Sequence, residues 1–589
     1  MDAPAKPRWT ERLAIVESLR GYRPADFLSD ATAGLIVGCV AIPLAIAFAI
    51  GSHANPTNGL VTVVIAGSLA ALFGGSRFLV TGPTGAFVVV LAGVVDKFEL
   101  LHPGQGLSYL LLATLVAGIL LVLAGVFKLG TVIKFIPYPV TVGFTAGIAV
   151  VIFANQTPDL FGVGLGAHPP AEPLVKAWEV LKGIVAHEGN RYAIGMALGT
   201  IAVIQLIKKF IPRVPGPIVA VGLFTIAAAI AGPHLPDGAI ITVESKYNAL
   251  PQGLPAPAIP SPLTAGFGAG WTAVREVFPS AITIAMLGAI ESLLAAVVAD
   301  GMVAGSTKGK TIRHDSNQEL IGQGIANIGS PLFGGIAATG AIARTATNIQ
   351  NGGRTPVSAL VHVAMVAAVL YFFAPYAGLI PMACLAGILA VVAWNMSERH
   401  HFAKILRMPR SDAAVMIATF GVTVLVDLTW GVMVGLIAAF ALFLHRMSGM
   451  TRVGAVDPLA DTAASEHRFT ADEVPHGVLV YSIDGPFFFG AADQFSEAMA
   501  RVSEAPKVVV LRMRDVPYLD ATGLNALERA IQGLQRRGTI VMISAIQSQP
   551  LDMLERSGAV KLVGDAGLFR DTSSALAAAR MRLAGPAPS

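Results

Sequence analysis

Two related stretches decide how this chain folds: LFGGIAATGAIAR at residues 332–344, and LFGG at residues 72–75 followed by TGPTGA at residues 81–86. Each ends an apolar run with the same four letters. Each then continues with a Thr, Gly and Ala-rich segment that is too short and too broken to cross a bilayer alone. A matched pair of interrupted segments in the two halves of a membrane protein is typical of a transporter's binding site. Close helix packing through small residues is the alternative interpretation, but it explains one such segment better than a matched pair.

A helix that begins inside the membrane has unpaired backbone N–H groups and partial positive charge at its start. Two such starts that face each other near the bilayer midplane make an anion site, and glycine lets a ligand approach the backbone closely. The sequence therefore predicts an anion-binding cradle made of backbone groups. Its members are Thr84, Gly85, Ala86, Gly340, Ala341 and Ile342.

The composition indicates a polytopic membrane protein. Of the 589 residues, 54% are hydrophobic and 13% are charged, whereas a soluble protein carries about 25% charged residues. The two cysteines lie inside apolar runs, so neither a disulfide framework nor a cysteine metal site is expected. We expect no cofactor, no metal and no nucleic-acid partner. Without a nucleophile–base pair, the chain is not expected to be an enzyme.

Fourteen apolar segments are expected between residues 31 and 446, in two inverted repeats of seven. An odd number of segments per repeat places the second half upside down relative to the first, as in many secondary carriers. The first seven lie near 31–50, 58–75, 82–95, 107–127, 139–156, 192–210 and 216–232. The second seven lie near 277–299, 318–334, 338–350, 356–374, 379–395, 412–428 and 430–446.

Basic residues test this count, because cytoplasmic loops hold most Lys and Arg. Arginines such as Arg20 and Arg23 precede the first span, and basic residues follow every even-numbered span up to the twelfth. The odd-numbered loops are nearly uncharged or mixed in charge. We therefore expect both termini in the cytoplasm.

After residue 446 the pattern becomes that of a small soluble α/β domain. Residues 477–483, 507–512 and 539–543 are expected to be strands, and they alternate with helical patterns at 491–503 and 523–533. The predicted organisation has four parts: a cytoplasmic N-terminal segment at 1–30, a membrane domain at 31–446, a polar linker at 447–475, and the soluble domain with its tail at 476–589.

The chain resembles the SulP (sulfate permease) family of anion transporters over nearly its whole length. The motifs that carry the resemblance are VTGPTGA (80–86), GFTAGI (143–148), LGAIESLL (287–294), NQEL (317–320) and TGAIART (339–345). In the soluble domain, LDATGL (519–524) resembles the STAS domain that ends such transporters.

This resemblance implies a core domain of spans 1–4 and 8–11 and a gate domain of spans 5–7 and 12–14. The substrate would lie between the third and tenth segments. The resemblance also implies a homodimer, to which the STAS domain contributes.

Two charged residues inside apolar spans are functional candidates, because charges there are costly. Glu291 lies in the middle of the eighth span, and desolvation favours the neutral form of a carboxyl group, so we expect it to couple transport to protons. The alternative is a fixed structural partner for Arg344. We expect Arg344 to supply positive potential to the anion. The alternative for Arg344 is a side chain that snorkels to the cytoplasmic face.

Phe48, on the first span, matches a family position that lines the substrate site. Without the resemblance, it would be interpreted as a lipid-facing or core residue. Pro43 is expected to interrupt the hydrogen bonding of this span and to aim Phe48 inward.

Departures from a related branch favour protons over sodium. The sodium-coupled bicarbonate branch has Asp at the position of Glu291, Thr one turn later where this chain has Ala295, and Thr where this chain has Ile342. Two oxygen ligands are therefore missing, and a hard cation needs oxygens. The sequences of residues 288–292 and 391–398 resemble the bacterial C4-dicarboxylate-transporting branch more than the bicarbonate branch.

In the STAS domain, Ala521 stands where the related anti-sigma-factor antagonists carry a phosphorylated serine. Alanine cannot be phosphorylated, so a phosphorylation switch is not expected. Asp520, at a strand-to-helix turn, is interpreted as a helix N-cap.

We expect a secondary active symporter of the bacterial inner membrane that carries a small oxyanion or carboxylate by an elevator-like movement, with a C4-dicarboxylate or sulfate favoured. The expected partners are that anion, protons, the lipid bilayer, a second copy of the chain and an unknown cytoplasmic partner of the STAS domain. The alternatives are a sodium-coupled bicarbonate transporter and a membrane-tethered STAS regulator that senses anions without transporting them.

Overall fold

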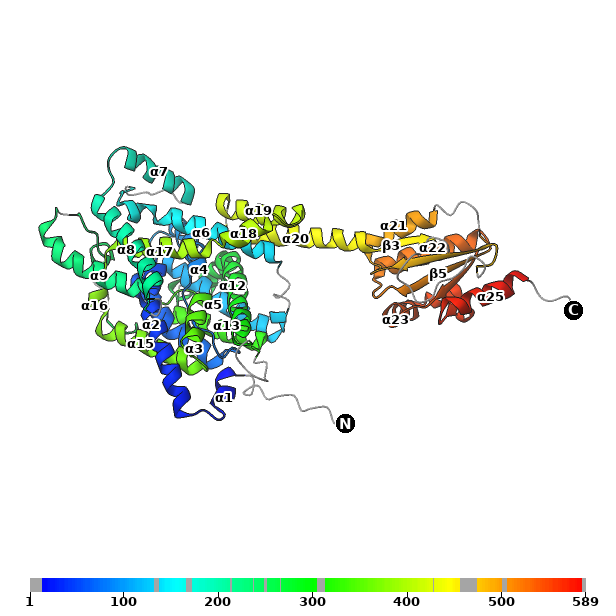
Figure 1. Ribbon diagram of the computed structural model, residues 1–589, viewed down its shortest axis with the longest axis horizontal. Coiled ribbons are helices and arrows are strands. Elements are labelled where there is room, and N and C mark those ends of the chain that lie inside the picture. The colour runs from blue at the N-terminus through cyan, green and yellow to red at the C-terminus, as the bar shows by residue number, and fades with distance from the viewer. Residues whose placement is uncertain are drawn as a thin grey trace. The chain divides into compact units, whose positions relative to one another are not determined.

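The computed structural model describes residues 13–131, 137–165, 172–211, 214–236, 238–247, 252–264, 266–304, 313–426, 428–455, 474–500 and 506–584. The chain divides into two compact units, one that ends at Leu436 and one that begins at Ile437 (Figure 1). Residues 1–12 of the predicted N-terminal segment and 456–473 of the predicted linker lie outside the described ranges.

Each of the fourteen predicted membrane segments contains a helix. In the first half these are α2 (Pro24–Gly51), α3 (Pro56–Phe73), α4 (Gly85–Leu101), α5 (Gly106–Val126), α6 (Tyr138–Phe161), α8 (Arg191–Phe210) and α9 (Gly216–Ala231). In the second half they are α12 (Phe267–Ala304), α13 (Ser316–Leu332), α14 (Ile342–Gln350), α15 (Pro356–Phe372), α17 (Met382–Met396), α19 (Arg410–Leu425) and α20 (Leu428–Met450). The short elements of this unit are α1 (Ala14–Leu19), η2 (Leu129–Thr131), α7 (Pro173–Val185), η4 (Gly232–His234), α10 (Val243–Tyr247), α11 (Ser261–Thr264), α16 (Ala374–Ala377) and α18 (Arg399–Ile405).

Helix length distinguishes one of the two interrupted segments from the ordinary spans. The helix of the other, α4, has 17 residues, as many as α13 and α15. Within the described ranges, eight helices are long and apolar enough to cross a membrane by themselves: α2, α3, α5, α6, α8, α9, α12 and α20. In contrast, α14 has nine residues, which at 1.5 Å per residue span about 14 Å. The hydrocarbon core of a bilayer is about 30 Å thick. Helix α14 is therefore a half-helix, as the sequence predicts.

The packing of the helices repeats between the two halves. Helix α2 packs against α15 and α12 packs against α5, while α6 packs against α19 and α17 packs against α8. In the repeat, α2 corresponds to α12 and α5 to α15, so the α2–α15 contact corresponds to the α12–α5 contact. Likewise α6 corresponds to α17 and α8 to α19, so the α6–α19 contact corresponds to the α17–α8 contact.

Strands β1 (Thr81–Gly82) and β2 (Thr339–Gly340) precede α4 and α14, the helices of the two interrupted segments. The first turns of these two helices are the half-helix starts. The two strands pair antiparallel, with Thr81 opposite Gly340 and Gly82 opposite Thr339, so the same correspondence maps the ladder onto itself. The pseudo-two-fold axis of the repeat passes through this ladder.

Small residues let some of these helices touch, which is what the packing interpretation of the glycine-rich sequence expects. A Cβ built at Gly118 of α5 would lie 2.8 Å from the Gly324 carbonyl oxygen of α13, and one built at Gly324 would lie 2.6 Å from that of Gly118. That interpretation is correct for this pair of helices. The half-helix starts differ, because a strand ladder joins the segments that precede them.

Pro43 lies inside helix α2 without breaking it. Helix α2 runs unbroken for 28 residues with Pro43 inside it. Proline removes one N–H donor from the ladder, but the helix continues through this position. Phe48 is nevertheless turned inward and is only 5% exposed.

The second unit is an α/β domain around a five-stranded sheet with the strand order β3-β4-β5-β6-β7. Strand β3 pairs antiparallel with β4, and the other neighbours are parallel. The strands are β3 (Arg452–Ala455), β4 (Val478–Asp484), β5 (Val508–Asp515), β6 (Ile540–Ser544) and β7 (Leu568–Phe569). The helices are α21 (Phe489–Ala500), α22 (Ala521–Arg536), α23 (Ser548–Ser557), α24 (Val560–Val563) and α25 (Thr572–Ala584). A short 3-10 turn, η6, covers Asp565–Gly567. The strands and helices predicted for this domain are therefore confirmed.

Both faces of this sheet are covered, which explains why β5 begins with four consecutive apolar residues. Val509 and Leu511 belong to the cluster formed with α21 and α22. Val508 and Val510 pack on the other face with Ala575 of α25 and its neighbours.

The predicted linker at 447–475 is partly wrong. Helix α20 continues to Met450, and residues 452–455 form the edge strand β3 of the sheet. Period-based reasoning missed this strand because four residues with a central glycine carry too little pattern to be recognised.

Candidate functional site

The site predicted from the sequence lies at the half-helix starts, where α4 and α14 begin. Thr84 and Ala341 are the residues that precede the first turns, and both have an extended backbone without a side-chain cap. The first N–H groups of a helix have no intrahelical partner. The two starts therefore combine unpaired donors with the positive ends of two helix dipoles.

Two of the six predicted cradle members are used elsewhere. The N–H group of Gly340 donates to the Ser292 hydroxyl at 3.0 Å, and that of Ala341 donates to the Val80 carbonyl at 2.9 Å. These two N–H groups hold the strands together and are already paired in this structure. The remaining predicted members are Thr84, Gly85, Ala86 and Ile342.

Helix α12 anchors the second strand through a hydroxyl pair that the sequence analysis did not single out. Ser292 and Thr339 share a hydrogen bond of 2.6 Å, and Thr339 also donates to the Gly288 carbonyl at 3.2 Å. Both hydroxyls are fully buried. The sequence could have indicated these two residues, since Ser292 lies inside the LGAIESLL motif and Thr339 inside TGAIART.

Glu291 lies at the other half-helix. Its carboxylate accepts a hydrogen bond of 2.9 Å from the Thr84 hydroxyl. This bond ties α12, from the second half of the chain, to the residue that begins α4 in the first half. Among the described residues, no ion pair joins Glu291 to Arg344, so the alternative interpretation of the two as structural partners is wrong.

Arg344 also connects the two halves of the chain, because it lies on α14 of the second half and bonds to Pro83 of the first half. The side chain starts on α14, is 2% exposed, and donates through Nη2 to the Pro83 carbonyl at 2.6 Å. The guanidinium packs against the Gly82 backbone, where a built Cβ would lie 2.6 Å from Nη1. Within the described part of the chain, Nη1 has no hydrogen-bond partner. The snorkelling alternative does not hold, because this arginine is buried between the two starts.

The start of α4 also lies next to α2 and α17. A Cβ built at Gly85 would lie 2.9 Å from the Met396 sulfur, 3.3 Å from Val392 Cγ1 and 3.5 Å from Phe48 Cε1. Phe48 is therefore next to the half-helix start and is not a lipid-facing residue. Met396 and Val392, from α17, were not predicted as site residues, because apolar residues of a span carry no functional signal on their own.

Ile342 occupies the first turn of α14 and is 39% exposed. Arg344, two residues later, faces the interior. The start of α14 thus presents an open side and a buried cationic side. Among the described residues, no group of three or more His, Cys, Asp or Glu side chains is arranged to hold a metal ion.

Comparison with known proteins decides the family. The sequence profile of the sulfate permease family matches residues 27–419, more than half of the chain. This chain belongs to the sulfate permease family. A STAS domain profile matches residues 470–575. The prediction of a membrane anion-transport domain followed by a STAS domain is confirmed.

Relatives of this family member include transporters of known name. The "Putative sulfate transporter YvdB" of Bacillus subtilis is 42% identical over 552 residues, covering 93% of this chain and 97% of that protein. The "Bicarbonate transporter BicA" of a Synechocystis strain is 32% identical over 572 residues, covering 95% of each chain. Members of this family are transporters, so the expectation that the chain is not an enzyme is confirmed.

Solved structures support the fold. The transmembrane domain of a cyanobacterium bicarbonate transporter BicA has a TM-score of 0.59 at 30% identity, covering 71% of this chain and 98% of that one. The overall structure of SLC26A9 has a TM-score of 0.82 at 17% identity, covering 97% of this chain and 93% of that one. The second likeness concerns the fold alone.

Proposed function

We propose that this sulfate permease family member is a proton-coupled secondary transporter for a small oxyanion or carboxylate. The observation that carries the proposal is the buried guanidinium of Arg344, which bridges the two half-helix starts by donating to the Pro83 carbonyl. Helix starts and guanidinium groups both stabilise anions. Nη1 of Arg344 is a donor without a partner in the described residues, and it is the proposed charged contact to the anion.

Backbone donors complete the proposed site. They come from Thr84, Gly85 and Ala86 at α4 and from Ile342 at α14, and Phe48 forms an apolar wall beside them. Gly85 has no side chain of its own to keep a ligand from the backbone, and the side chains of Met396, Val392 and Phe48 surround it.

Glu291 is the proposed proton carrier. Its hydrogen bond to Thr84 places its charge at one wall of the cradle. A carboxylate there repels an incoming anion, whereas a protonated carboxyl group does not, so binding of the proton and the anion is cooperative. This cooperativity is what symport requires.

Sodium coupling has less support. The Ala295 side chain, one turn after Glu291, is fully buried hydrocarbon. The hydroxyls of Ser292 and Thr339 are bonded to each other, and Ile342 supplies no side-chain oxygen. Hard cations such as sodium need several oxygen ligands, and this region has few side-chain oxygens that are free to bind one.

The proposed substrates follow from the chemistry of the cradle. Two helix starts and one guanidinium suit any small anion that carries oxygens. The sequence similarity of residues 288–292 and 391–398 to the dicarboxylate-transporting branch favours a C4-dicarboxylate. A relative that is named a putative sulfate transporter favours sulfate. Bicarbonate, named in another relative, is the alternative substrate.

The proposed mechanism is an elevator-like movement of a core against a gate. The core would comprise α2–α5 with α12–α15, and the gate would comprise α6, α8, α9, α17, α19 and α20. Met396 and Val392 of the proposed gate lie next to the start of α4 through apolar side chains, which form no hydrogen bond that the movement would have to break. We further propose a bacterial inner-membrane location, cytoplasmic termini, a homodimer and a cytoplasmic partner for the STAS domain.

Uptake by proteoliposomes tests this function. Purified full-length protein takes up labelled succinate, sulfate or bicarbonate under a pH gradient or, separately, a sodium gradient. Glu291→Gln is measured beside Glu276→Gln, which removes a carboxylate from the same helix at a partly exposed position paired with His102. We expect uptake driven by the pH gradient in the wild type and in Glu276→Gln but not in Glu291→Gln. The Glu291→Gln protein should still exchange anion for anion.

Two results would contradict the proposal. Uptake driven by sodium alone would favour the bicarbonate alternative. A Glu291→Gln protein that still accumulates anion against its gradient, at the wild-type rate, would exclude Glu291 as the proton carrier.

A further inference from the structure

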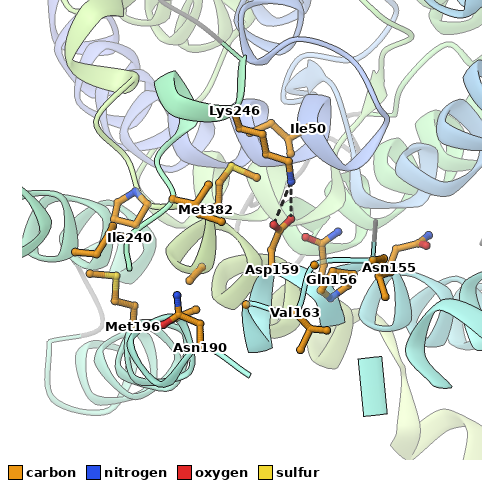
Figure 2. Close-up of a pocket in the computed structure, with 18 of the residues that line it drawn as sticks. Ile50, Asn155, Gln156, Asp159, Val163, Asn190, Met196, Ile240, Lys246 and Met382 are labelled. Atoms are coloured by element: carbon orange, nitrogen blue, oxygen red, sulfur yellow. Dashed lines mark hydrogen bonds and ion pairs between the residues drawn. The ribbon is translucent and has the colours of Figure 1, made fainter. Parts of the chain in front are cut away.

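A cavity lies at the end of α2 opposite its N-terminal start, apart from the starts of α4 and α14. It has a volume of about 390 Å³ and is lined by the ends of α2 and α6, the beginnings of α8 and α17, helix α7 and residues 239–247 (Figure 2). Two backbone bonds fix the last of these segments, from Val243 to Ile380 and from Glu244 to Gly378. The cavity is therefore a built feature between several elements and not the space beneath a single loop.

Lys176 of α7 is a buried cation that lines this cavity. The residue is 7% exposed, and Nζ donates to the Asn155 side-chain oxygen at 3.2 Å. An ammonium group has three donors, and within the described residues the Lys176 ammonium makes no other hydrogen bond or ion pair. Burial lowers the pKa of the Lys176 ammonium, and the charges of Asp96 and Asp159 partly offset this effect. Placing a cation inside a protein with one neutral acceptor is costly.

The other charges around the cavity are already paired. Lys246 contacts Asp159 at 3.1 Å, as the dashed lines in Figure 2 show. His53 contacts Asp96 at 2.6 Å. Lys176 is therefore the lining cation, among the described residues, that has no carboxylate within ion-pair distance.

A neutral donor accompanies this lysine. Gln156 of α6 lines the cavity and is 6% exposed, and its side-chain amide makes no hydrogen bond within the described ranges. Its amide nitrogen lies 3.8 Å from a Cβ built at Gly51, the last residue of α2. An ammonium group and an amide N–H₂ group facing one cavity form a recognition pattern for an anion.

The cavity adjoins the candidate site along α2 and α4. Gly51 is three residues after Phe48, about 4.5 Å along a helix axis. A Cβ built at Gly51 would lie 2.8 Å from Val88 Cγ1, one turn after Gly85. The two regions thus share the same pair of helices, with Phe48 and Val88 between them.

We propose that this cavity is a second anion site, in which the Lys176 ammonium and the Gln156 amide hold a small oxyanion or carboxylate before it passes Phe48 to the site between α4 and α14. The inference rests on the proposed transport function and adds to it a loading site at the outer end of the path. Asn190 is not one of its ligands, because its amide caps α8 and donates to the Ala239 carbonyl.

Substitutions of Lys176 test the loading site in the full-length protein. Lys176→Gln removes the charge, Lys176→Arg retains it, and Lys182→Gln removes an exposed charge from the same helix, where Lys182 pairs with Glu179. Initial uptake of succinate, sulfate and bicarbonate is measured in right-side-out and inverted membrane vesicles. Purified protein is also tested for thermal stabilisation by each anion.

We expect Lys176→Gln to raise KM roughly 10-fold in right-side-out vesicles, with the maximal rate nearly unchanged, because a charge-assisted hydrogen bond to the anion is lost. Lys176→Arg should restore most of the affinity, and Lys182→Gln should resemble the wild type. In inverted vesicles, Lys176→Gln should leave KM unchanged. A Lys176→Gln protein with wild-type KM in both orientations would overturn the loading site while leaving transport intact.

Thermal stabilisation separates failure of this inference from failure of the proposed function. If the wild type transports none of the three anions, the transport proposal fails. The loading site then stands only if an anion stabilises the wild type and stabilises Lys176→Gln clearly less. Equal stabilisation of both proteins, or of neither, would overturn it. A fall in melting temperature without anion in both Lys176 variants would instead indicate a purely structural role.

Discussion

Replacing Gly82 with alanine tests whether Arg344 works from the position in which the structure places it. The new Cβ would lie 2.6 Å from Arg344 Nη1, 3.2 Å from Nη2 and 3.3 Å from Cζ. Ordinary contact begins near 3.4 Å, so the guanidinium must retreat by roughly 1 Å. The Nη2 bond to Pro83 measures 2.6 Å, and after such a shift it exceeds the length of a normal hydrogen bond.

The size of the effect follows from this lost bond. A hydrogen bond to a charged group contributes about 1.5–3 kcal/mol, which corresponds to roughly 10-fold to 150-fold in an equilibrium constant. Alanine itself fits the extended backbone of β1 and slightly reduces the entropy of the unfolded chain. We therefore expect Gly82→Ala to fold, and to raise KM for the transported anion at least 10-fold.

The control is Gly93→Ala, in the middle of α4. A Cβ at Gly93 meets no atom within 4 Å, and alanine favours a helix by about 0.5–1 kcal/mol relative to glycine. Gly93→Ala should transport as the wild type does. Both variants are assayed by initial uptake in proteoliposomes and by thermal unfolding with and without anion.

A double variant makes the test decisive, because residues that act through one contact are not additive. If Gly82→Ala acts by displacing Arg344, it should have almost no further effect in the Arg344→Gln background. Wild-type KM in Gly82→Ala, or full additivity of the two substitutions, would refute the reasoning that this guanidinium is held against Gly82.

Three further predictions concern stability and the second unit. Glu319→Gln should lower the free energy of unfolding of the membrane domain by about 1–3 kcal/mol, because the buried N–H groups of Gly75 and Ser76 both donate to this carboxylate at 2.9 Å. An unchanged melting temperature would contradict this expectation. Asp520→Ala should lower the free energy of unfolding of the STAS domain by about 0.5–2 kcal/mol, since Asp520 caps α22. It should also speed amide hydrogen exchange in the first turn of α22, whereas Asp520→Asn should leave both quantities nearly unchanged. Deletion of residues 447–589 should leave most anion uptake intact in proteoliposomes, and its complete loss in a folded protein would favour the regulator alternative.

The sequence by itself determined the class of the protein and most of its elements. Hydrophobic runs fix where helices can cross a bilayer, because unpaired backbone groups are excluded from hydrocarbon, and all fourteen predicted segments contain a helix. The paired LFGG stretches located the half-helix starts, since a broken span is visible in the order of residues alone. In the same way, Asp520 at a strand-to-helix turn was recognisable as a cap, and the structure confirms it.

Partners that meet across the repeat were decided only by the tertiary structure. The sequence predicted Glu291 and Arg344 as functional charges and left open whether they pair. The structure joins Glu291 to Thr84 and Arg344 to Pro83. Each bond connects residues more than two hundred positions apart, and no local pattern specifies which backbone oxygen a long side chain will reach.

The same limit applies to the paired donors of the two strands and to the cavity around Lys176. The N–H groups of Gly340 and Ala341 bind Ser292 and Val80, which became neighbours only when the two strands paired. Lys176 appeared in the sequence as one charge of a mixed loop. Its burial depends on how α7 folds onto the ends of other helices, because the environment of a side chain is set by what packs around it rather than by its place in the chain.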